Sequence, residues 1–345
     1  MDNSQTLSSP LKERYVGLDI LKFICAFFVV CIHSHMNGAY MQYFISVTRV
    51  AVPVFFMITG FFYSGTEKRH RETAQIKKIF RLAVFASILF FVWEVLVYSL
   101  SGELESYLSN CFSLRSVLGF IFLNYTPICG HLWYLFAILY VLVIVYFAKR
   151  HNFMKVLYIL TPFLLIGDQL LGNYSKFLFG FVLARRCVRN FLFVGIPYFC
   201  IGNLIFRFKD RIFAVPYLSA KCAALSVLFC VTTVLERLFL VSKNACSLRD
   251  HGMSILFLSV SLFILFISVY KKRTPSAAES LAATIGRRYS SSIYIIHPIF
   301  IRIVDFLMKQ IGIFDIYIHF SAVIIFAVTA AAVIIFEKLK RSAAK

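Results

Sequence analysis

Long apolar segments separated by short polar ones run along nearly the whole chain. Ten of them approach the roughly 20 apolar residues that a helix needs to cross the hydrocarbon core of a bilayer. The pattern predicts an all-α fold, a polytopic membrane helix bundle of about ten transmembrane helices. The predicted spans are Gly17–His35, Phe44–Ser64, Ile79–Leu100, His131–Ala148, Phe153–Leu171, Asn190–Phe206, Ala214–Leu235, Ser254–Tyr270, Tyr289–Met308 and Tyr317–Phe336.

Composition supports this prediction. Of 345 residues, 60% are apolar and only 15% are charged, whereas soluble domains have about 25% charged residues. We expect one membrane-embedded domain over residues 15–336, with polar tails at 1–14 and 337–345. Two short apolar stretches, Ser116–Ile128 and Tyr174–Ala184, are predicted to be re-entrant or interfacial pieces. No cleavage site follows the first apolar run, so we expect it to be retained as a helix.

The formal net charge is +20, from 36 Lys and Arg against 16 Asp and Glu. Most of these cations fall in the segments that face the cytoplasm when the N-terminus is inside, and cytoplasmic loops of membrane proteins are rich in Lys and Arg. We therefore expect both termini to be cytoplasmic, and the charge to interact with the membrane and not with nucleic acid. No C-x-x-C spacing indicates a metal site, and none is expected.

The first predicted span contains several ionisable residues, Asp19, Lys22 and His33 among them. A charge at the bilayer centre costs at least about 2.5–3.5 kcal/mol, so such residues are functional candidates. Eleven positions separate Lys22 from His33, about 1,100° of helical rotation, which places both on one face about 16 Å apart. Asp19 lies near the same stripe. Histidine titrates near neutrality and is a suitable general base. The alternatives are a snorkelling lysine and a packed, hydrogen-bonded histidine.

The second span carries Arg49, then Pro53, which frees a backbone carbonyl, and Thr59-Gly60, which permits close helix approach. These features are typical of tight packing around a cavity, or simply of tight packing. The basic segment after it ends Lys77-Lys78-Ile-Phe-Arg81. It is interpreted either as ordinary cytoplasmic charge or as a phosphate clamp.

Further polar residues lie in later spans. Glu94 lies within the third span, where pairing with a neighbouring cation is the alternative to a functional role. His131 and Trp133 open the fourth span, where interfacial aromatic residues are expected in any case. Ser290, Tyr294 and His297 belong to the ninth span, where Pro298 loosens the backbone. Together these residues would give several helices polar faces that lipid does not tolerate.

Five motifs in order resemble those of acyltransferase family 3, integral membrane enzymes that acylate bacterial surface glycans. The resemblance covers about Tyr15 to Phe336. Three motifs depart from the family pattern by one residue each, with Lys for Arg at Lys22 and in the basic motif, and Thr for Ser at Thr59. The motifs are Asp19…Lys22-x10-His33, Phe55-Phe-Met-Ile-Thr-Gly-Phe61, Lys78-Ile-Phe-Arg81, His131-Leu-Trp-Tyr-Leu135 and Ser290-x3-Tyr294-x2-His297-Pro298.

The resemblance implies transfer of an acyl group, most often acetyl, from cytoplasmic acyl-CoA to an extracytoplasmic glycan or lipid-linked sugar at the bacterial inner membrane. Acyl-CoA would be a co-substrate, and no bound cofactor is expected. His33 would be the general base, with the choice between His131 and His297 as its assistant left open. The resemblance also implies catalytic roles for His33, Asp19, His131 and His297, acyl-CoA binding by Lys22, Lys77, Lys78 and Arg81, and acceptor or pore-lining roles for Arg49, Trp133, Tyr294, Ser290 and Glu94.

The segment from Arg49 to Gly60 is also similar to the membrane portion of the vancomycin-resistance serine racemases. Those proteins carry a soluble racemase domain that we do not find in this sequence, so we expect no racemisation. The similarity leaves open a secondary transporter of a small polar solute, such as an amino acid or cell-wall precursor. A transporter would favour an inverted repeat, and none is evident. An inactive scaffold is a third alternative.

Overall fold

The computed structural model describes residues 14–36, 38, 40–65, 69–245, 252–271 and 273–343. Over these residues the chain forms helices and turns without a strand, which confirms the predicted all-α fold. Most of the predicted N-terminal tail, 1–13, and the last two residues of the predicted C-terminal tail lie outside the described residues.

The helices of the first half include the site-bearing α1, α3, α4 and α7. They are α1 (Val16–His33), α2 (Met41–Thr48), α3 (Ala51–Ser64), α4 (Arg69–Ser101), α5 (Leu104–Phe112), α6 (Leu114–Leu123), the 3-10 turn η1 (Gly130–Leu132), α7 (Trp133–Arg150) and α8 (Met154–Asp168). The rest are η2 (Gln169–Asn173), α9 (Ser175–Phe179), η3 (Arg185–Cys187), η4 (Phe191–Gly195), α10 (Ile196–Arg207), α11 (Lys209–Phe213), α12 (Leu218–Ser242), α13 (Met253–Tyr270), α14 (Ala277–Ile311), α15 (Phe314–Tyr317) and α16 (Ser321–Ala343).

In the described part of the chain, nine helices are long and apolar enough to cross a membrane, or ten if the bent pair α5–α6 is one span. These nine match nine of the ten predicted spans. The prediction for Asn190–Phe206 differs, because the helical segment Phe191–Arg207 is shorter than a full span and begins with the π-turn η4. The stretch Ser116–Ile128, predicted to be re-entrant, contributes to α6, which meets α5 at an angle of 51°.

Two helices are much longer than their predicted spans. The segment expected to be a basic loop is helical, because α4 begins at Arg69 and contains no Gly or Pro to interrupt it. In the same way α14 begins at Ala277, where Ser276 and Glu279 form a reciprocal capping box. Both helices therefore extend beyond their apolar runs.

The second span is broken at Arg49, which separates α2 from α3. Pro53 has no N–H to donate to the Arg49 carbonyl, so the helix loses a hydrogen bond at this point. The junction places Arg49 where two short helices meet, while the backbone there keeps right-handed helical angles, so α2 and α3 together form one span.

Glycines set the closest helix contacts of the bundle. A Cβ at Gly60 would lie 2.0 Å from the carbonyl oxygen of Phe199, so α3 and α10 approach to backbone contact. A Cβ at Gly286 would lie 2.0 Å from the carbonyl oxygen of Asp19, which joins α14 to α1 in the same way. Small residues at membrane helix interfaces allow this approach, as the Thr59-Gly60 pair predicted.

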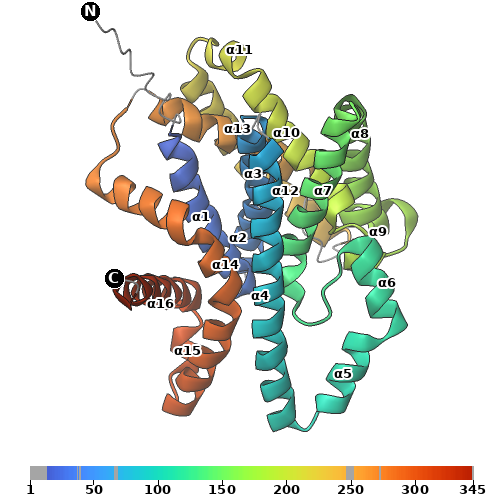
Figure 1. Ribbon diagram of the computed structural model, residues 1–345, viewed down its shortest axis with the longest axis vertical. Coiled ribbons are helices and arrows are strands. Elements are labelled where there is room, and N and C mark those ends of the chain that lie inside the picture. The colour runs from blue at the N-terminus through green and yellow to red at the C-terminus, as the bar shows by residue number, and fades with distance from the viewer. Residues whose placement is uncertain are drawn as a thin grey trace, which may run out of the picture.

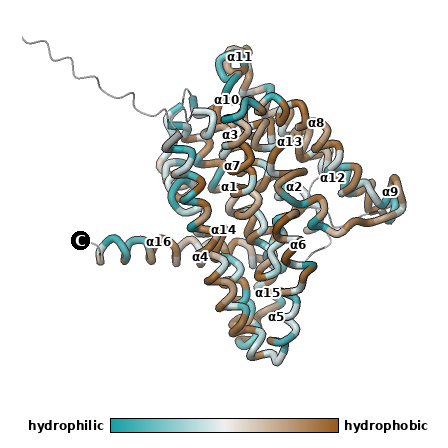
Figure 2. The backbone as a smooth tube through the Cα atoms, turned by 45° about the vertical axis from the view of Figure 1, so that its right-hand side comes forward, coloured by the Kyte–Doolittle hydropathy of each residue, from teal (hydrophilic) through white to brown (hydrophobic). Residues whose placement is uncertain are grey.

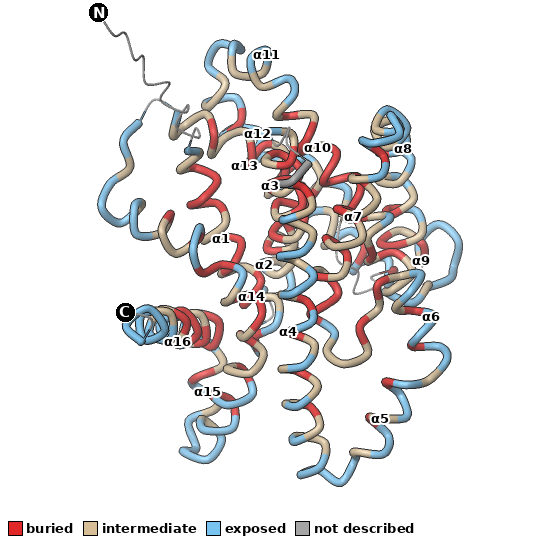
Figure 3. The backbone as a smooth tube through the Cα atoms, in the orientation of Figure 1, coloured by how far each residue is buried: buried red, intermediate tan, exposed pale blue. Residues whose placement is uncertain are grey.

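Burial separates a central group of helices from a peripheral one (Figure 3). The buried residues concentrate in α1, α3, α7, α10 and α13. By contrast, α12 buries only 17% of its apolar stretch, against 56% for α1, and exposes side chains such as Val227 and Leu228. Figure 2 shows hydrophobic residues along most helices and hydrophilic ones at α11 and the C-terminal part of α16. An apolar exterior of this kind suits contact with lipid.

The ends of the helices fall into two groups (Figure 1). The start of α1, the start of α8 and α11 lie at the upper end of the view, and α5 and α15 at the lower end. The upper end gathers segments predicted to be cytoplasmic. The orientation in the membrane stays a prediction. The last helix, α16, is seen nearly end-on and so crosses the others.

Candidate active site

Three histidines meet near the middle of the bundle. His33 ends α1, His131 lies in η1 before α7, and His297 lies in α14. Their ring centroids are 5.1 Å apart for His33 and His297, 5.6 Å for His131 and His297, and 6.4 Å for His33 and His131. α1 and α14 run parallel, since Gly286 contacts Asp19 and His297 contacts His33 further along both helices. The cluster therefore joins motifs far apart in sequence.

Both ring nitrogens of His131 have partners. Its Nε2 lies 3.0 Å from the backbone oxygen of Ile295, which can only accept, so Nε2 carries the proton. Its Nδ1 lies 3.1 Å from the Sγ of Cys129 and accepts from the thiol. Burial raises the pKa of Cys129 to about 12, so the thiol stays protonated and is not a thiolate nucleophile. His131 is thus held in one tautomer.

His297 is bonded on one side alone. Its Nδ1 lies 2.8 Å from the backbone oxygen of Tyr294 and 3.2 Å from that of Ile293, and donates to them. Its Nε2 is buried, and none of the described residues lies within hydrogen-bond distance of it. A buried acceptor without a donor is uncommon in folded proteins. This nitrogen is therefore available to a donor that enters the cluster.

His33 is the accessible member of the cluster. It is exposed, whereas His131 and His297 are buried behind it. An accessible imidazole that a substrate hydroxyl can reach is what a general base requires.

A cavity of about 160 Å³, which we call the Lys22 cavity, extends from Lys22 to Tyr294. Five helices line it, α1, α3, α4, α7 and α14, and its polar side chains include Thr59, Gln75 and Ser290. Tyr294 closes it toward the cluster, because this residue lines the cavity and its hydroxyl donates to the His131 carbonyl oxygen. The cavity thus links two of the sequence motifs that carry candidate residues.

Lys22 is paired at the mouth of this cavity. Its Nζ lies 3.2 Å from Asp19 Oδ1, and the Arg14 Nε lies 3.7 Å from Asp19 Oδ2. The structure therefore does not bring Asp19 to the histidines, since fourteen helical positions, about 21 Å, separate it from His33. Asp19 instead holds Lys22. Three predicted acyl-CoA ligands are exposed on α4, beside the cavity and not in its lining: Lys77, Lys78 and Arg81.

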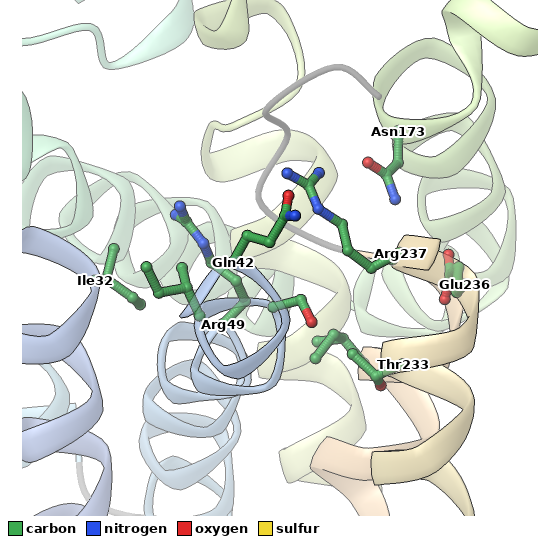
Figure 4. Close-up of a pocket in the computed structure, with 11 residues that line it drawn as sticks. Ile32, Gln42, Arg49, Asn173, Thr233, Glu236 and Arg237 are labelled. Carbon is green, nitrogen blue, oxygen red and sulfur yellow. The ribbon is translucent and has the colours of Figure 1, made fainter. Parts of the chain in front are cut away.

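Arg49 lines a second cavity, of about 200 Å³ (Figure 4). Figure 4 shows Arg49, Gln42 and Arg237 directed toward the same side of it. Glu236, also in its wall, accepts from the Met253 N–H at 2.8 Å and so caps the start of α13. The sequence predicted Arg49 here but not its neighbours, which come from distant helices.

The remaining predicted residues have separate positions. Glu94 is buried and pairs with Arg302 of α14, with Nη1 and Oε2 2.8 Å apart, which is the cation pairing considered from the sequence. Trp133 is buried and carries the Arg189 guanidinium 5.1 Å above its ring. Sequence reasoning missed Arg189 as a site residue, although three arginines lie within five positions there.

No group of three His, Cys, Asp or Glu suited to a metal occurs among the residues whose positions are described. The histidine cluster combines an accessible imidazole with two buried ones. It can exchange protons with a group that reaches His33, and it can hold a donor at His297.

The fold and this site define a multi-pass membrane protein with a histidine centre inside its helix bundle. The family model of the acyltransferase domain matches residues 15–337, and the chain belongs to this family, acyltransferase family 3. It is 24% identical over 325 residues to an amino-acid racemase of Enterococcus faecalis, covering 88% of this chain and 43% of that protein. It is 25% identical over 321 residues to a serine/alanine racemase of Enterococcus gallinarum, covering 86% and 42%.

The chain spans less than half the length of these curated relatives. No solved structure matches it. The comparisons therefore assign the acyltransferase family, and the racemase activity named for the relatives belongs to those longer proteins.

Proposed function

We propose that this acyltransferase moves an acyl group, most often acetyl, from cytoplasmic acyl-CoA to a hydroxyl of an extracytoplasmic glycan or lipid-linked sugar at the bacterial inner membrane. The observation that carries the proposal is the position of Tyr294, which lines the Lys22 cavity and bonds to the backbone of His131. A donor entering beside Lys22 would therefore end next to the histidines.

The size of the cavity limits what enters it. About 160 Å³ is below the roughly 300–1,000 Å³ of sites that enclose a whole ligand. We infer that the narrow pantetheine arm enters and the nucleotide stays outside. The exposed cations Lys77, Lys78 and Arg81 lie on the helix that contributes Gln75 and Ile79 to the wall, and they are suited to its phosphates.

His33 is the proposed general base, because it is the accessible histidine of the three. It takes the proton from the acceptor hydroxyl while the hydroxyl oxygen bonds to the acyl carbon. The thioester C–S bond then breaks, and the proton passes from His33 to the sulfur of CoA. One proton and one acyl group are exchanged, and no oxidant or metal is needed.

We assign the assisting role to His297. Both nitrogens of His131 are already bonded, whereas Nε2 of His297 lies buried without a donor and its ring lies 5.1 Å from His33. An N–H of His33, or a hydroxyl of the acceptor, would supply that donor. His297 is then a positioning residue that fixes the His33 ring or the entering hydroxyl.

Mass spectrometry of envelope glycans tests the proposal without knowledge of the acceptor. Cells lacking the gene are expected to lose one acyl increment, and the intact gene to restore it. The His33→Ala variant should restore less than about 1% of it, because a general base contributes 10²–10⁴-fold. The matched control is His151→Ala, which removes an exposed histidine of the α7–α8 turn.

Membrane abundance of each variant is measured by immunoblot so that expression is compared first. A glycan profile that does not depend on the gene would contradict the acyl transfer itself. Full restoration by His33→Ala at normal abundance would contradict only the role of His33 as base.

A further inference from the structure

A cavity of about 300 Å³ lies between the bent pair α5–α6 and the helices α4 and α7. Its wall includes Phe91 of α4, Phe120 of α6, and Leu132 and Phe136 at the start of α7. We call it the apolar cavity. Apolar cavities of this kind bind apolar groups, because filling them removes hydrocarbon surface from water. The volume is at the lower end of that of ligand sites, so it suits part of a long chain.

Contacts between the helices hold the apolar cavity open. The Tyr140 hydroxyl donates to the Phe120 carbonyl at 3.0 Å, and the rings of Phe120 and Phe136 pack with their centroids 4.8 Å apart, so α6 is fixed to α7. Tyr107 of α5 stacks on Tyr98 of α4 with centroids 4.6 Å apart. The bend of 51° between α5 and α6 therefore spans the space between two fixed ends.

The apolar cavity lies beside a surface that suits lipid. The side chains of Ile88 and Val92 on α4 are more than half exposed, and so are those of Ile121 and Phe122 on α6. Helices α4 and α7 are both long and apolar enough to cross a membrane. Because apolar side chains are exposed where a helix meets lipid, a hydrocarbon chain can reach this cavity from the bilayer without crossing water.

A polar cavity adjoins the apolar one. It has a volume of about 410 Å³, and its wall includes Asn110, Arg115 and Asn124. The two cavities share the buried residues Ser116 and Thr126. A polar space and an apolar space that meet in this way match an amphiphile, a molecule with a polar head and a hydrocarbon chain.

Both cavities meet the histidine cluster at the turn η1. Gly130 lies in the wall of the polar cavity and Leu132 in the wall of the apolar cavity, with His131 between them in the turn. The Phe90 ring also lies 4.6 Å from the His131 ring. A head in the polar cavity is therefore close to a residue of the candidate active site.

We propose that the apolar cavity binds the hydrocarbon chain of a lipid-linked sugar, whose sugar enters the polar cavity as the acceptor. This inference rests on the proposed function and selects one of its two acceptor classes, the lipid-linked sugar. An ordinary bilayer phospholipid has a similar chain. The position of the polar cavity at the histidine-bearing turn favours a substrate over such a lipid.

The probe is dodecyl β-glucoside with a diazirine at the end of its chain, photolysed with the full chain in phosphatidylcholine nanodiscs. Mass spectrometry then locates the labelled residues. Labelling of Phe91 and Cys111, both in the cavity wall, should saturate and fall about 10-fold with excess unlabelled dodecyl β-glucoside. Labelling of the exposed Ile88 on the same helix should not saturate, because it reports on bulk lipid.

Variants that fill the cavity test the site directly. Ser87→Leu adds an apolar side chain from the α4 wall and should weaken labelling of Cys111 about 10-fold, the value of about two buried methylene groups. The matched control is Ser99→Leu, the same change on the same helix outside the lining, which should leave labelling unchanged. Val117→Phe fills the cavity from the α6 wall and serves if Ser87→Leu does not fold.

Thermal unfolding of each variant establishes that it is folded. Labelling of Phe91 and Cys111 that does not saturate, or that survives filling of the cavity in folded protein, overturns the proposal. Nanodiscs of phosphatidylglycerol should leave the labelling intact, and its loss there assigns the cavity to bilayer lipid instead.

The two proposals fail separately. If acyl-CoA is consumed in a His33-dependent manner while the apolar cavity is not labelled, this inference fails and the proposed function stands. If the cavity is labelled saturably and His33→Ala changes no acyl transfer, the proposed role of His33 fails while the hydrocarbon site stands.

Discussion

The Lys22 cavity and the cavity of about 410 Å³, which we call the arginine cavity after Arg115, Arg185, Arg186 and Arg189 in its wall, differ in charge. The first contains one lysine, which Asp19 already pairs at 3.2 Å, and is otherwise lined by hydroxyl, amide and apolar groups. The second has four arginines among its described lining residues. A nearly neutral passage suits an uncharged arm such as the pantetheine of the proposed donor, whereas charged side chains line the second cavity. The comparison predicts that substitutions at the two cavities affect different measurements.

The two cavities are also built differently. Long helices in backbone contact surround the first, as at Gly286 against Asp19. Short helices and turns surround the second, and the side chains of Asn124 and Asn190 hold them together. Loop-built sites tolerate sequence change more readily than helix contacts do. We therefore expect the Lys22 cavity, the proposed donor site, to be sensitive to changes in side-chain size, and the arginine cavity to be sensitive to changes in charge.

The largest expected effect is that of Gly286→Ala. Alanine normally stabilises a helix interior by about 1 kcal/mol relative to glycine, but here its Cβ would lie 2.0 Å from the Asp19 carbonyl oxygen. Separating α14 from α1 should cost more than about 3 kcal/mol and remove most of the folded protein. Thermal unfolding of the purified protein in detergent measures this.

Gly130→Ala is the matched control at the other cavity. No atom lies within 4 Å of a Cβ at Gly130, so the same change there should leave the unfolding midpoint unaltered. Equal midpoints for the two variants would show that α1 and α14 can separate without cost. This result would contradict the importance of close helix contact for the Lys22 cavity.

The next effect concerns Lys22. Replacing it by Met removes the cation from the cavity mouth, and the KM for acyl-CoA should rise about 10–100-fold, the value of a charge-assisted hydrogen bond to a carbonyl of the pantetheine arm. Lys22→Arg keeps the charge and should stay within about 3-fold of the parent. Initial rates of CoA release at varied acyl-CoA concentration give both values.

Arg186→Gln supplies the control at the arginine cavity, because this residue lies outside the lining of the Lys22 cavity and its loss should leave the KM for acyl-CoA unchanged. Lys22→Met also leaves the buried Asp19 carboxylate without its lysine. Asp19→Asn removes the charge of that carboxylate and so checks whether its loss of a partner, and not the loss of the lysine, raises the KM. An unchanged KM in Lys22→Met would remove Lys22 from the donor site.

The sequence predicted the local features of the fold well. Apolar runs located nine helices long enough to span, and the Thr59-Gly60 pair predicted the close contact of α3 with α10. The length of α4 was missed because an apolar run marks where lipid contact ends, whereas a helix continues until a residue interrupts it. Helix formation and membrane crossing are separate physical requirements.

The candidate site was predictable only where a motif carried it. His33, His131 and His297 were identified separately, and the structure brings their rings within 6.4 Å of one another. The pairing of Glu94 with Arg302 and the assembly of the arginine cavity depend on contacts between distant segments. Spacing along one helix already separates Asp19 from His33 by about 21 Å, and the structure adds that Asp19 pairs with Lys22 instead.

The smallest expected effect concerns Tyr294, which lies between the Lys22 cavity and the histidines. Tyr294→Phe removes the hydroxyl that donates to the His131 carbonyl, which should lower the free energy of unfolding by about 1 kcal/mol. The hydroxyl of Tyr140 donates to the Phe120 carbonyl at 3.0 Å and lines neither cavity. Tyr140→Phe should therefore have a similar cost. Only Tyr294→Phe should also reduce kcat, about 3–10-fold with KM for acyl-CoA unchanged, because it loosens the backbone that positions His131. Denaturation curves and steady-state rates separate the two effects, and equal kcat values for the two variants would mean that the boundary tyrosine stabilises the bundle without serving the reaction.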